Sequence, residues 1–214
     1  LLAAPFSSVS AKYLTVVCST SDFCDGIAFQ YAKGNEMQNG QYERTENHVP
    51  YMEIMGMDLP SVPTDHNPGK DDAIYLHGGG FVLEAAGYHY SNAMRYAKEV
   101  GCKVVFPLYR LAPQHPFPAF FEDCYAAFTW AYDRAGELGI DIDRIGIGGD
   151  SAGSTLAVGV CLMARQRSHP VKFRFQMLPY PFLDARNESE SCKRFTDTPM
   201  WNSSLSDRIG PMTK

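Results

Sequence analysis

From residue 73 onward, the hydrophobic and polar positions form two kinds of stretch: short apolar runs rich in β-branched residues, and longer runs with helical spacing. The short runs predict strands and the longer runs predict helices. Short apolar strands separated by helices are typical of a mostly parallel sheet with helices on both faces, so the pattern predicts an α/β fold. In chain order the expected elements are strand 73–76, helix 90–99, strand 103–108, helix 119–138, strand 144–149, helix 152–166 and strand 173–178.

The first seventy residues are less regular. The runs "YLTVVCS" (13–19) and "GIAFQYA" (26–32) predict two short strands that could pair, and 61–72 is a polar loop rich in Pro and Gly. We expect a single domain over 1–214, and we expect it to be incomplete. Its parts are an irregular N-terminal cap with the first strands (1–70), a core (73–184) and a candidate cap segment (185–214).

Composition narrows the classes of partner. The chain has 24 acidic and 19 basic side chains and no basic run, which argues against binding to nucleic acid or to an anionic membrane surface. No apolar run approaches the roughly 20 residues of a membrane-spanning helix. The six cysteines lack the spacing of a metal site, and we expect reduced thiols in the core. We therefore expect a cytoplasmic protein without a metal, with secretion after removal of a leader left open.

The sequence "GGDSAGS" (148–154) contains the pattern GxSxG, with Ser151 between Gly149 and Gly153. A nucleophilic serine must stand clear of the backbone on a tight strand-to-helix turn, where flanking glycines remove side chains that would collide. Here the pattern lies between an expected strand and an expected helix, which favours a nucleophile. A phosphate-binding turn or a purely structural glycine turn is the alternative.

The sequence "HGGGF" (77–81) follows strand 73–76 directly. Attack on a carbonyl places negative charge on oxygen, and backbone N–H groups unobstructed by side chains can stabilise that charge. The carboxyl ends of parallel strands share one edge of the sheet, so this loop should lie near Ser151. A flexible hinge loop is the alternative, but it would not explain the flanking His77 and Phe81.

Four segments together resemble the hormone-sensitive-lipase-like branch of the α/β-hydrolases: 77–81, "YRLAPQHPFPA" (109–119), "DRIGIGGDSAG" (143–153) and "LPYPFLD" (178–184). The resemblance implies an α/β-hydrolase fold and a carboxylesterase that cleaves small carboxylic esters without a cofactor. By position it implies Ser151 as the nucleophile that carries the acyl group. The N–H groups of Gly79, Gly80 and Ala152 would form the oxyanion hole, with Gly78 shaping the loop.

The resemblance also implies supporting residues. His77 would organise the loop rather than act as the base, and Tyr109, Arg110, Asp123 and Asp150 would be structural supports around the turn at Ser151, which Gly149 and Gly153 make possible. The chain departs from the family pattern at Glu84 and Ser154, where glycine is usual, and at Gln114, where an acidic residue is common.

The acid and the base of a catalytic triad are not evident. In this hydrolase class both follow the serine in the chain, and only His169 qualifies as a histidine. His169 precedes strand 173–178, which places it at the opposite end of the sheet, and Asp184 follows that strand as a less favoured candidate acid. We therefore expect both groups to come from a C-terminal part outside these 214 residues.

Two functions stay open: a serine esterase, or a non-catalytic binding protein or inactive fragment on the same fold. Besides an ester substrate, a completing C-terminal fragment or a second copy of the chain could be a partner.

Overall fold

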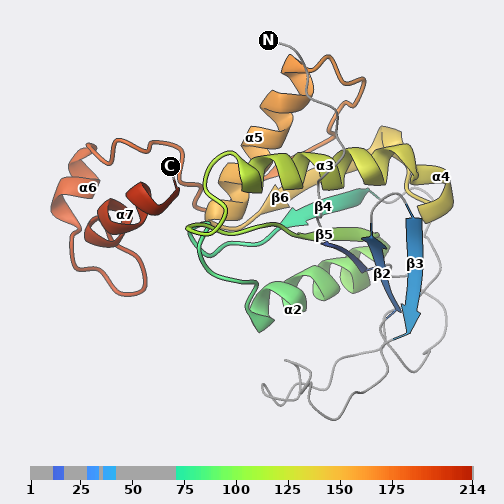
Figure 1. The fold of residues 1–214 in the computed structure, drawn as a ribbon, viewed down its shortest axis with the longest axis horizontal. Coiled ribbons are helices and arrows are strands. Elements are labelled where there is room, and N and C mark those ends of the chain that lie inside the picture. The colour runs from blue at the N-terminus through green and yellow to red at the C-terminus, as the bar shows by residue number, and fades with distance from the viewer. Residues whose placement is uncertain (1–11, 17–27, 34–35, 42–70, 214) are drawn as a thin grey trace.

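The computed structural model describes residues 12–16, 28–33, 36–41 and 71–213, and it contains one seven-stranded sheet of mixed direction. The strands lie in the order β3-β2-β1-β5-β4-β6-β7 (Figure 1). The four strands on the β5-to-β7 side are parallel, while β1, β2 and β3 are antiparallel to their neighbours. The strands are β1 (Lys12–Val16), β2 (Ala28–Lys33), β3 (Glu36–Gln41), β4 (Asp72–Leu76), β5 (Val104–Leu108), β6 (Ile145–Gly149) and β7 (Gln176–Met177).

Helices cover both faces of the sheet, as the sequence predicts. In Figure 1, α3 and α5 lie on one face and α2 lies on the other. The helices are α2 (Gly87–Tyr96), which continues as a π-turn (Ala97–Gly101), α3 (Ala119–Asp133), α4 (Ala135–Leu138) and α5 (Ala152–Gln166). A 3₁₀ turn (Ile142–Arg144) precedes β6.

The core is divided by the sheet into two clusters of buried apolar side chains. Ile74 and Leu76 of β4 belong to the cluster under α3 and α5, whereas Tyr75 belongs to the cluster under α2. Successive side chains of a strand point to opposite faces, so the alternation along β4 fixes which helix each residue meets. This packing fixes the ends of β4 and β6, from which the candidate site is built.

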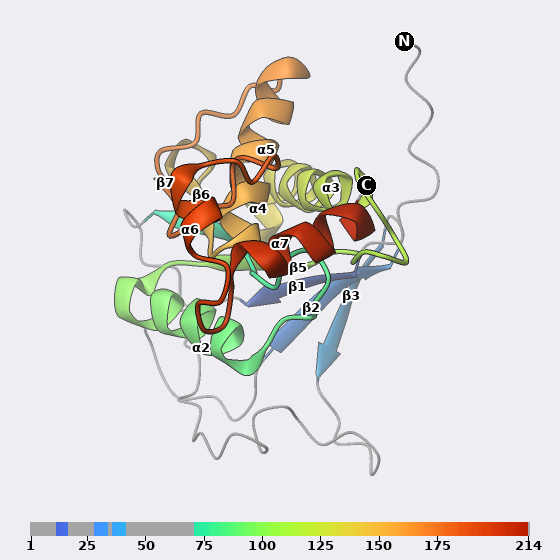
Figure 2. The same ribbon diagram turned by 90° about the vertical axis from the view of Figure 1, so that its left-hand side faces the viewer.

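The last helices lie outside this core. The helices α6 (Glu190–Arg194) and α7 (Ser203–Ile209), followed by a 3₁₀ turn (Gly210–Thr213), lie beyond the carboxyl ends of the parallel strands (Figures 1 and 2). Among the described residues of 185–213, none belongs to either core cluster. This segment therefore covers the edge of the sheet where the glycine-rich loop and Ser151 lie.

Several element boundaries differ from the sequence prediction. The expected helix 119–138 is interrupted at Arg134, whose φ of −106° and ψ of 18° are not helical. The expected strand 173–178 is reduced to Gln176–Met177, and just beyond it the carbonyl of Pro179 accepts a hydrogen bond from the N–H of Ser151. β3 was not predicted: its sequence EMQNGQ is polar, and its pairing with β2 decides its conformation.

Other predictions concern residues only partly within the described part of the chain. The pairing of the first two strands is observed between Lys12–Val16 and Ala28–Lys33, and most of loop 61–72 lies outside the described residues. Four cysteines are free thiols: Cys102, Cys124, Cys161 and Cys192; Cys18 and Cys24 lie outside the described residues. No described helix is long and apolar enough to cross a membrane, and no described cluster of side chains could hold a metal ion.

Candidate active site

Ser151 occupies a strained turn between β6 and α5. Its φ of 53° and ψ of −117° lie in a region that L-residues rarely adopt, which costs about 1–3 kcal/mol. Its N–H donates to the carbonyl of Pro179 (3.3 Å). Within the described residues its hydroxyl makes no hydrogen bond, and it lines a cavity. The turn therefore presents the hydroxyl away from the backbone, as the GxSxG pattern predicts.

The two glycines of the pattern are required by a close approach of the chain to itself. A Cβ at Gly149 or at Gly153 would collide with the carbonyl oxygen of Leu76 at the end of β4. At Gly153 it would also meet the carbonyl of His77, at 2.8 Å. Because these obstacles are backbone atoms of a buried strand, neither glycine can be replaced without moving the strand.

The glycine-rich loop runs from the end of β4 to the same cavity. Gly79 (φ 116°), Gly80 (φ 62°) and Phe81 (φ 66°) all have positive φ, and the Gly79 carbonyl accepts hydrogen bonds from Val82 and Leu83. In the described part of the chain, the N–H groups of Gly79 and Gly80 donate to no protein acceptor. The loop therefore leaves two backbone donors free, and Gly80 lines the same cavity as Ser151.

The N–H of Ala152 is a third donor of this kind. Ala152 is the first residue of α5, and N–H groups of a first helical turn have no acceptor within their own helix. Gly80, Ser151 and Ala152 line one cavity, so the structure brings two of the predicted oxyanion residues together with the predicted nucleophile, whereas Gly78 and Gly79 do not line this cavity.

The buried carboxylate of Asp150, the residue before Ser151, helps to hold the turn in place. Asp150 is 6% exposed, and its carboxylate accepts hydrogen bonds from the Tyr75 hydroxyl (2.7 Å) and from Nε2 of His89 (3.2 Å). Burial alone would raise the pKa of Asp150, but these two hydrogen bonds, together with the electrostatic effect of His89 and His77, hold the pKa below its ordinary value. Gly78 permits this approach, because a Cβ there would lie 2.6 Å from Asp150 Oδ2.

His89 is a site residue that the sequence analysis missed. It is 1% exposed, and its Nδ1 accepts a hydrogen bond from the N–H of Ala86 (2.8 Å), which assigns the ring proton to Nε2 and makes Nε2 the donor to Asp150. The N–H of Gly78 lies 3.2 Å from the same nitrogen. The ring therefore lies between the glycine-rich loop and the turn at Ser151. The expected helix began one residue after His89, which left His89 in a loop.

His77 supports the loop and does not face Ser151 as a base would. Its ring stacks on Tyr109 (4.2 Å between centroids), and its Nδ1 donates to the carbonyl of Gly78 (2.7 Å). The Tyr109 hydroxyl donates to the carbonyl of His77 (2.7 Å). Burial lowers the pKa of His77 to about 4, so the ring is neutral at neutral pH.

This lowered pKa predicts a pH dependence of stability. The unfolded chain takes up a proton on His77 as pH falls below about 6.5, whereas the folded protein does so only near pH 4, so acid favours unfolding within this window. Between pH 7 and pH 5 we expect His77 to lower the free energy of unfolding by about 2 kcal/mol. Urea unfolding at both pH values measures it. The His77→Gln variant should lose this part of the pH dependence, and equal pH dependence in both proteins would contradict the assignment.

The loop after β7 is tied to α5 by two hydroxyl groups. Ser154, which stands where the family usually has glycine, shares its single hydroxyl proton between the carbonyls of Gly149 (2.7 Å) and Pro179 (2.9 Å). The Thr155 hydroxyl donates to the carbonyl of Phe182 (2.8 Å) and accepts from the N–H of the same residue (3.0 Å). These contacts hold 180–182 beside Ser151.

An ion pair between Arg110 and Asp123 supports the loop that follows β5. The Arg110 side chain makes a bidentate contact with Asp123 (2.8 and 2.7 Å), and the N–H of Arg110 also donates to it (2.9 Å). Asp123 is buried within α3. The pair fixes the loop to the helix next to it, in agreement with the structural role predicted for both residues.

No triad histidine lies at Ser151 among the described residues. His169 follows the far end of α5, a 15-residue helix about 22 Å long that begins beside Ser151. Its ring packs against Tyr132 (4.7 Å) and Phe128 (4.9 Å). Asp184 is exposed and makes a bidentate ion pair with Arg186 (2.8 Å each), which lowers its pKa to about 2. Neither residue contacts Ser151.

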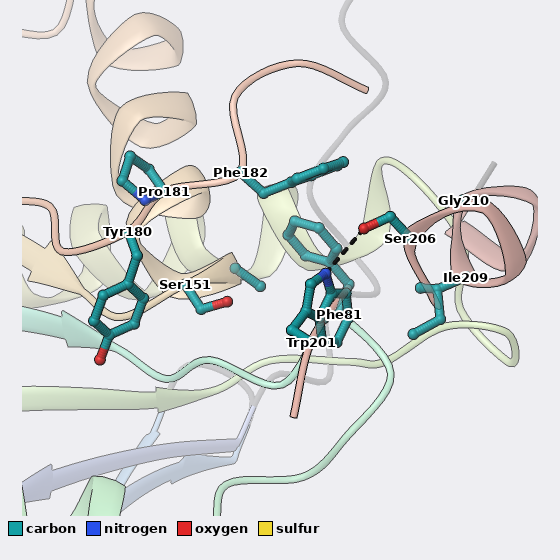
Figure 3. A pocket seen from close by; sticks show the side chains of 11 residues that line it. Phe81, Ser151, Tyr180, Pro181, Phe182, Trp201, Ser206, Ile209 and Gly210 are labelled. Carbon is teal, nitrogen blue, oxygen red and sulfur yellow. Dashed lines mark hydrogen bonds between the residues drawn. The ribbon is translucent and has the colours of Figure 1, made fainter. Parts of the chain in front are cut away.

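The cavity at Ser151 is small and mostly apolar. Its volume is about 140 Å³, and Figure 3 shows the Ser151 hydroxyl pointing into it between Tyr180 and Trp201. The glycine-rich loop, the first turn of α5, loop 180–182 and the α7 region each contribute to its wall. The lining residues are Gly80, Phe81, Ser151, Ala152, Tyr180, Pro181, Phe182, Trp201, Ser206, Ile209 and Gly210.

Comparisons with known proteins identify the family and the fold. A family model described as alpha/beta hydrolase fold matches residues 73–212. Esterase LipI of Mycobacterium tuberculosis is 41% identical over 50% of this chain and 33% of its own length. The hormone-sensitive lipase of Mus musculus is 32% identical over 60% of this chain and 17% of its own length. The solved structure of a bacterial heroin esterase matches with a TM-score of 0.66 and 38% identity, over 70% of this chain and 47% of that protein.

The chain thus spans about a third of the length of LipI and about half of that of the heroin esterase. The match covers the parallel strands, the glycine-rich loop, the turn at Ser151 and the α6–α7 segment. The family model covers more than half of the chain, and the relatives carry the names of esterases and of hormone-sensitive lipase. The chain belongs to the α/β-hydrolase fold family, in the branch of carboxylesterases that resemble hormone-sensitive lipase.

Proposed function

We propose that the protein is a serine carboxylesterase that cleaves small esters through an acyl-enzyme on Ser151. The observation that carries this proposal is the conformation of Ser151: a positive φ in a turn that two glycines make possible, with the hydroxyl in an apolar cavity. A structural serine gains nothing from such strain, whereas a nucleophile gains access to its substrate.

In this mechanism, Ser151 Oγ forms a bond to the ester carbonyl carbon while its proton passes to a histidine base. The carbonyl oxygen becomes an oxyanion that accepts hydrogen bonds from the N–H groups of Gly79, Gly80 and Ala152. The bond to the alcohol then breaks, the alcohol takes the proton from the base, and an acyl-enzyme results. Water attacks the acyl-enzyme in the same way and releases the acid.

The base and its acid partner are expected from outside the described residues. The support for the remaining parts is geometric. Gly80, whose N–H is free, and Ala152 line the cavity that holds Ser151, and backbone donors need no reorganisation when charge develops. His77, His89 and Asp150 would hold these groups in place without touching the substrate.

The second candidate function is a protein that binds a carboxylate ligand in the same cavity without chemistry. It is favoured by one observation: within the described residues, no histidine contacts Ser151. The same free N–H groups would then bind the ligand's oxygen atoms. The two functions differ in one property, the reactivity of the Ser151 hydroxyl.

Incubation of the full-length protein with an alkyl fluorophosphonate, followed by intact mass measurement and peptide mapping, separates them. An activated serine forms a bond to phosphorus as fluoride leaves. We expect one adduct per chain on Ser151, and none on protein unfolded in urea. An unmodified mass under native conditions would overturn the esterase and leave the binding protein.

A further inference from the structure

Trp201 connects the α6–α7 segment to the glycine-rich loop. A Cβ built at Gly80 would collide with the far edge of the Trp201 ring, with Cζ3 at 2.9 Å, so the indole lies directly against this glycine. Trp201 also lines the cavity that contains Ser151, and Figure 3 shows its ring below Phe182. The same side chain therefore contacts the proposed oxyanion loop and closes one side of the cavity.

Hydrogen bonds fix the position of this ring. The indole Nε1–H donates to the hydroxyl of Ser206 on α7 (2.9 Å), and the carbonyl of Trp201 accepts from the Thr198 hydroxyl (2.7 Å). Asn202, the next residue, caps α7 by accepting from the N–H of Leu205 (2.9 Å). Hydrogen bonds therefore hold both the backbone of Trp201 and the polar edge of its ring.

The residue before Trp201 is far more exposed than Trp201 itself. Met200 has a φ of 66° and is 98% exposed, whereas Trp201 is 38% exposed and lines the cavity. Two adjacent large apolar residues therefore differ in their contact with the site. Met200 provides a matched control for changes at Trp201.

The volume left beside Trp201 limits what can enter. A cavity of about 140 Å³ is close to the roughly 150 Å³ that accommodates one benzene molecule in an apolar site. An apolar arm of up to about six carbon atoms matches such a volume better than an eight-carbon chain does. Two serines line the cavity, Ser151 and Ser206. The Ser206 hydroxyl already accepts a hydrogen bond from the indole of Trp201.

We propose that Trp201 is a specificity-determining residue: its ring, held by Ser206 against Gly80, closes the Ser151 cavity and restricts the ester to one short apolar arm. This inference rests on the esterase proposed above. The arm is either the acyl group or the alcohol group, since both flank the carbonyl that Ser151 attacks. Removing the indole joins the cavity to the space that the ring fills and admits a longer arm.

The test measures kcat/KM with the full-length protein for two ester series. One series varies the acyl group as p-nitrophenyl acetate, butyrate and octanoate, and the other varies the alcohol as ethyl, butyl and octyl acetate. In one series we expect the wild type to prefer the four-carbon over the eight-carbon arm by about tenfold or more, as expected when methylene groups are excluded from a pocket. Trp201→Ala should lower that preference by at least tenfold.

Two further variants separate the ring from its hydrogen bond. Trp201→Phe keeps a ring against Gly80 but loses the donor to Ser206, so its preference should lie between those of the wild type and the alanine variant. Met200→Ala removes an exposed apolar side chain next to Trp201 and should keep the wild-type preference. Thermal unfolding of each variant tests for loss of the fold, and Trp201→Leu replaces the alanine variant if α7 unfolds.

The outcomes distinguish this inference from the esterase itself. An unchanged preference in both series for all Trp201 variants, with short esters still hydrolysed, would overturn the role of Trp201 and leave the esterase intact. If the wild type hydrolyses no ester and Ser151 takes up no fluorophosphonate, the esterase fails and this inference fails with it. The series in which the preference changes identifies the arm that occupies the cavity.

Discussion

Replacement of Ser151 by alanine is expected to lower kcat/KM for p-nitrophenyl acetate by about 10⁴- to 10⁶-fold in the full-length protein. The substitution removes the oxygen that forms the acyl-enzyme, and loss of a triad nucleophile in serine hydrolases has effects of this size. The oxyanion donors remain, so a small residual rate above the uncatalysed reaction is expected. Initial rates at substrate concentrations well below KM give the comparison.

Ser204 provides a matched control for this experiment. It is an exposed serine at the start of α7, its hydroxyl bonds the carbonyl of Thr196, and it does not line the cavity. Ser204→Ala therefore makes the same chemical change elsewhere and should keep activity within about twofold. Retention of more than about 1% of the activity in Ser151→Ala, with purity verified by mass, would refute Ser151 as the nucleophile.

Replacement of Gly153 by alanine is expected to destabilise the fold by about 3 kcal/mol or more. A methyl group at this position would overlap the carbonyl oxygen of Leu76 and contact that of His77, and both belong to backbone that cannot move aside. For a chain of this size the loss corresponds to a decrease in Tm of roughly 6–12 °C. Circular dichroism during thermal unfolding measures it.

Whether Gly153→Ala lowers or raises the stability shows whether close packing or helix propensity dominates at this position. Gly153 lies in the first turn of α5, where propensity alone would favour alanine by up to about 1 kcal/mol. Gly136 in α4 is the control, because a Cβ there meets no atom within 4 Å. Gly136→Ala should leave stability unchanged or raise it slightly. A Tm of Gly153→Ala equal to or above that of the wild type would contradict the described geometry.

Much of the fold could be predicted because local sequence and tertiary packing agree in the central part of the chain. The apolar runs that form β4, β5 and β6 are buried on both faces, and helix 152–166 is observed with the predicted bounds. Predictions failed where tertiary contacts override local pattern. β3 has a polar sequence and pairs only because β2 lies beside it, and β7 is confined to Gln176–Met177 although the apolar run 173–178 predicts a longer strand.

Parts of the candidate site could be proposed from local patterns in the sequence. Ser151 and the glycine-rich loop are identified by short motifs, and residues of both line one cavity. His89, Ser154 and Thr155 act through partners 11 to 61 residues away, and a single sequence holds no local signal for such contacts. The contact of Trp201 with Gly80 has the same character, because the two residues approach only when α7 folds over the loop.

The α6–α7 segment lies outside both core clusters, so we expect it to unfold more easily than the part of the site that contains Ser151. Among its described residues only Ser203 is buried, so little apolar surface would be exposed if the segment opened by itself. Backbone amides of α7 should then exchange with solvent through local opening, whereas those of β6 and α5 exchange only when the whole fold unfolds. We therefore expect the wall of the cavity that contains Trp201 to open on heating before the turn at Ser151 does.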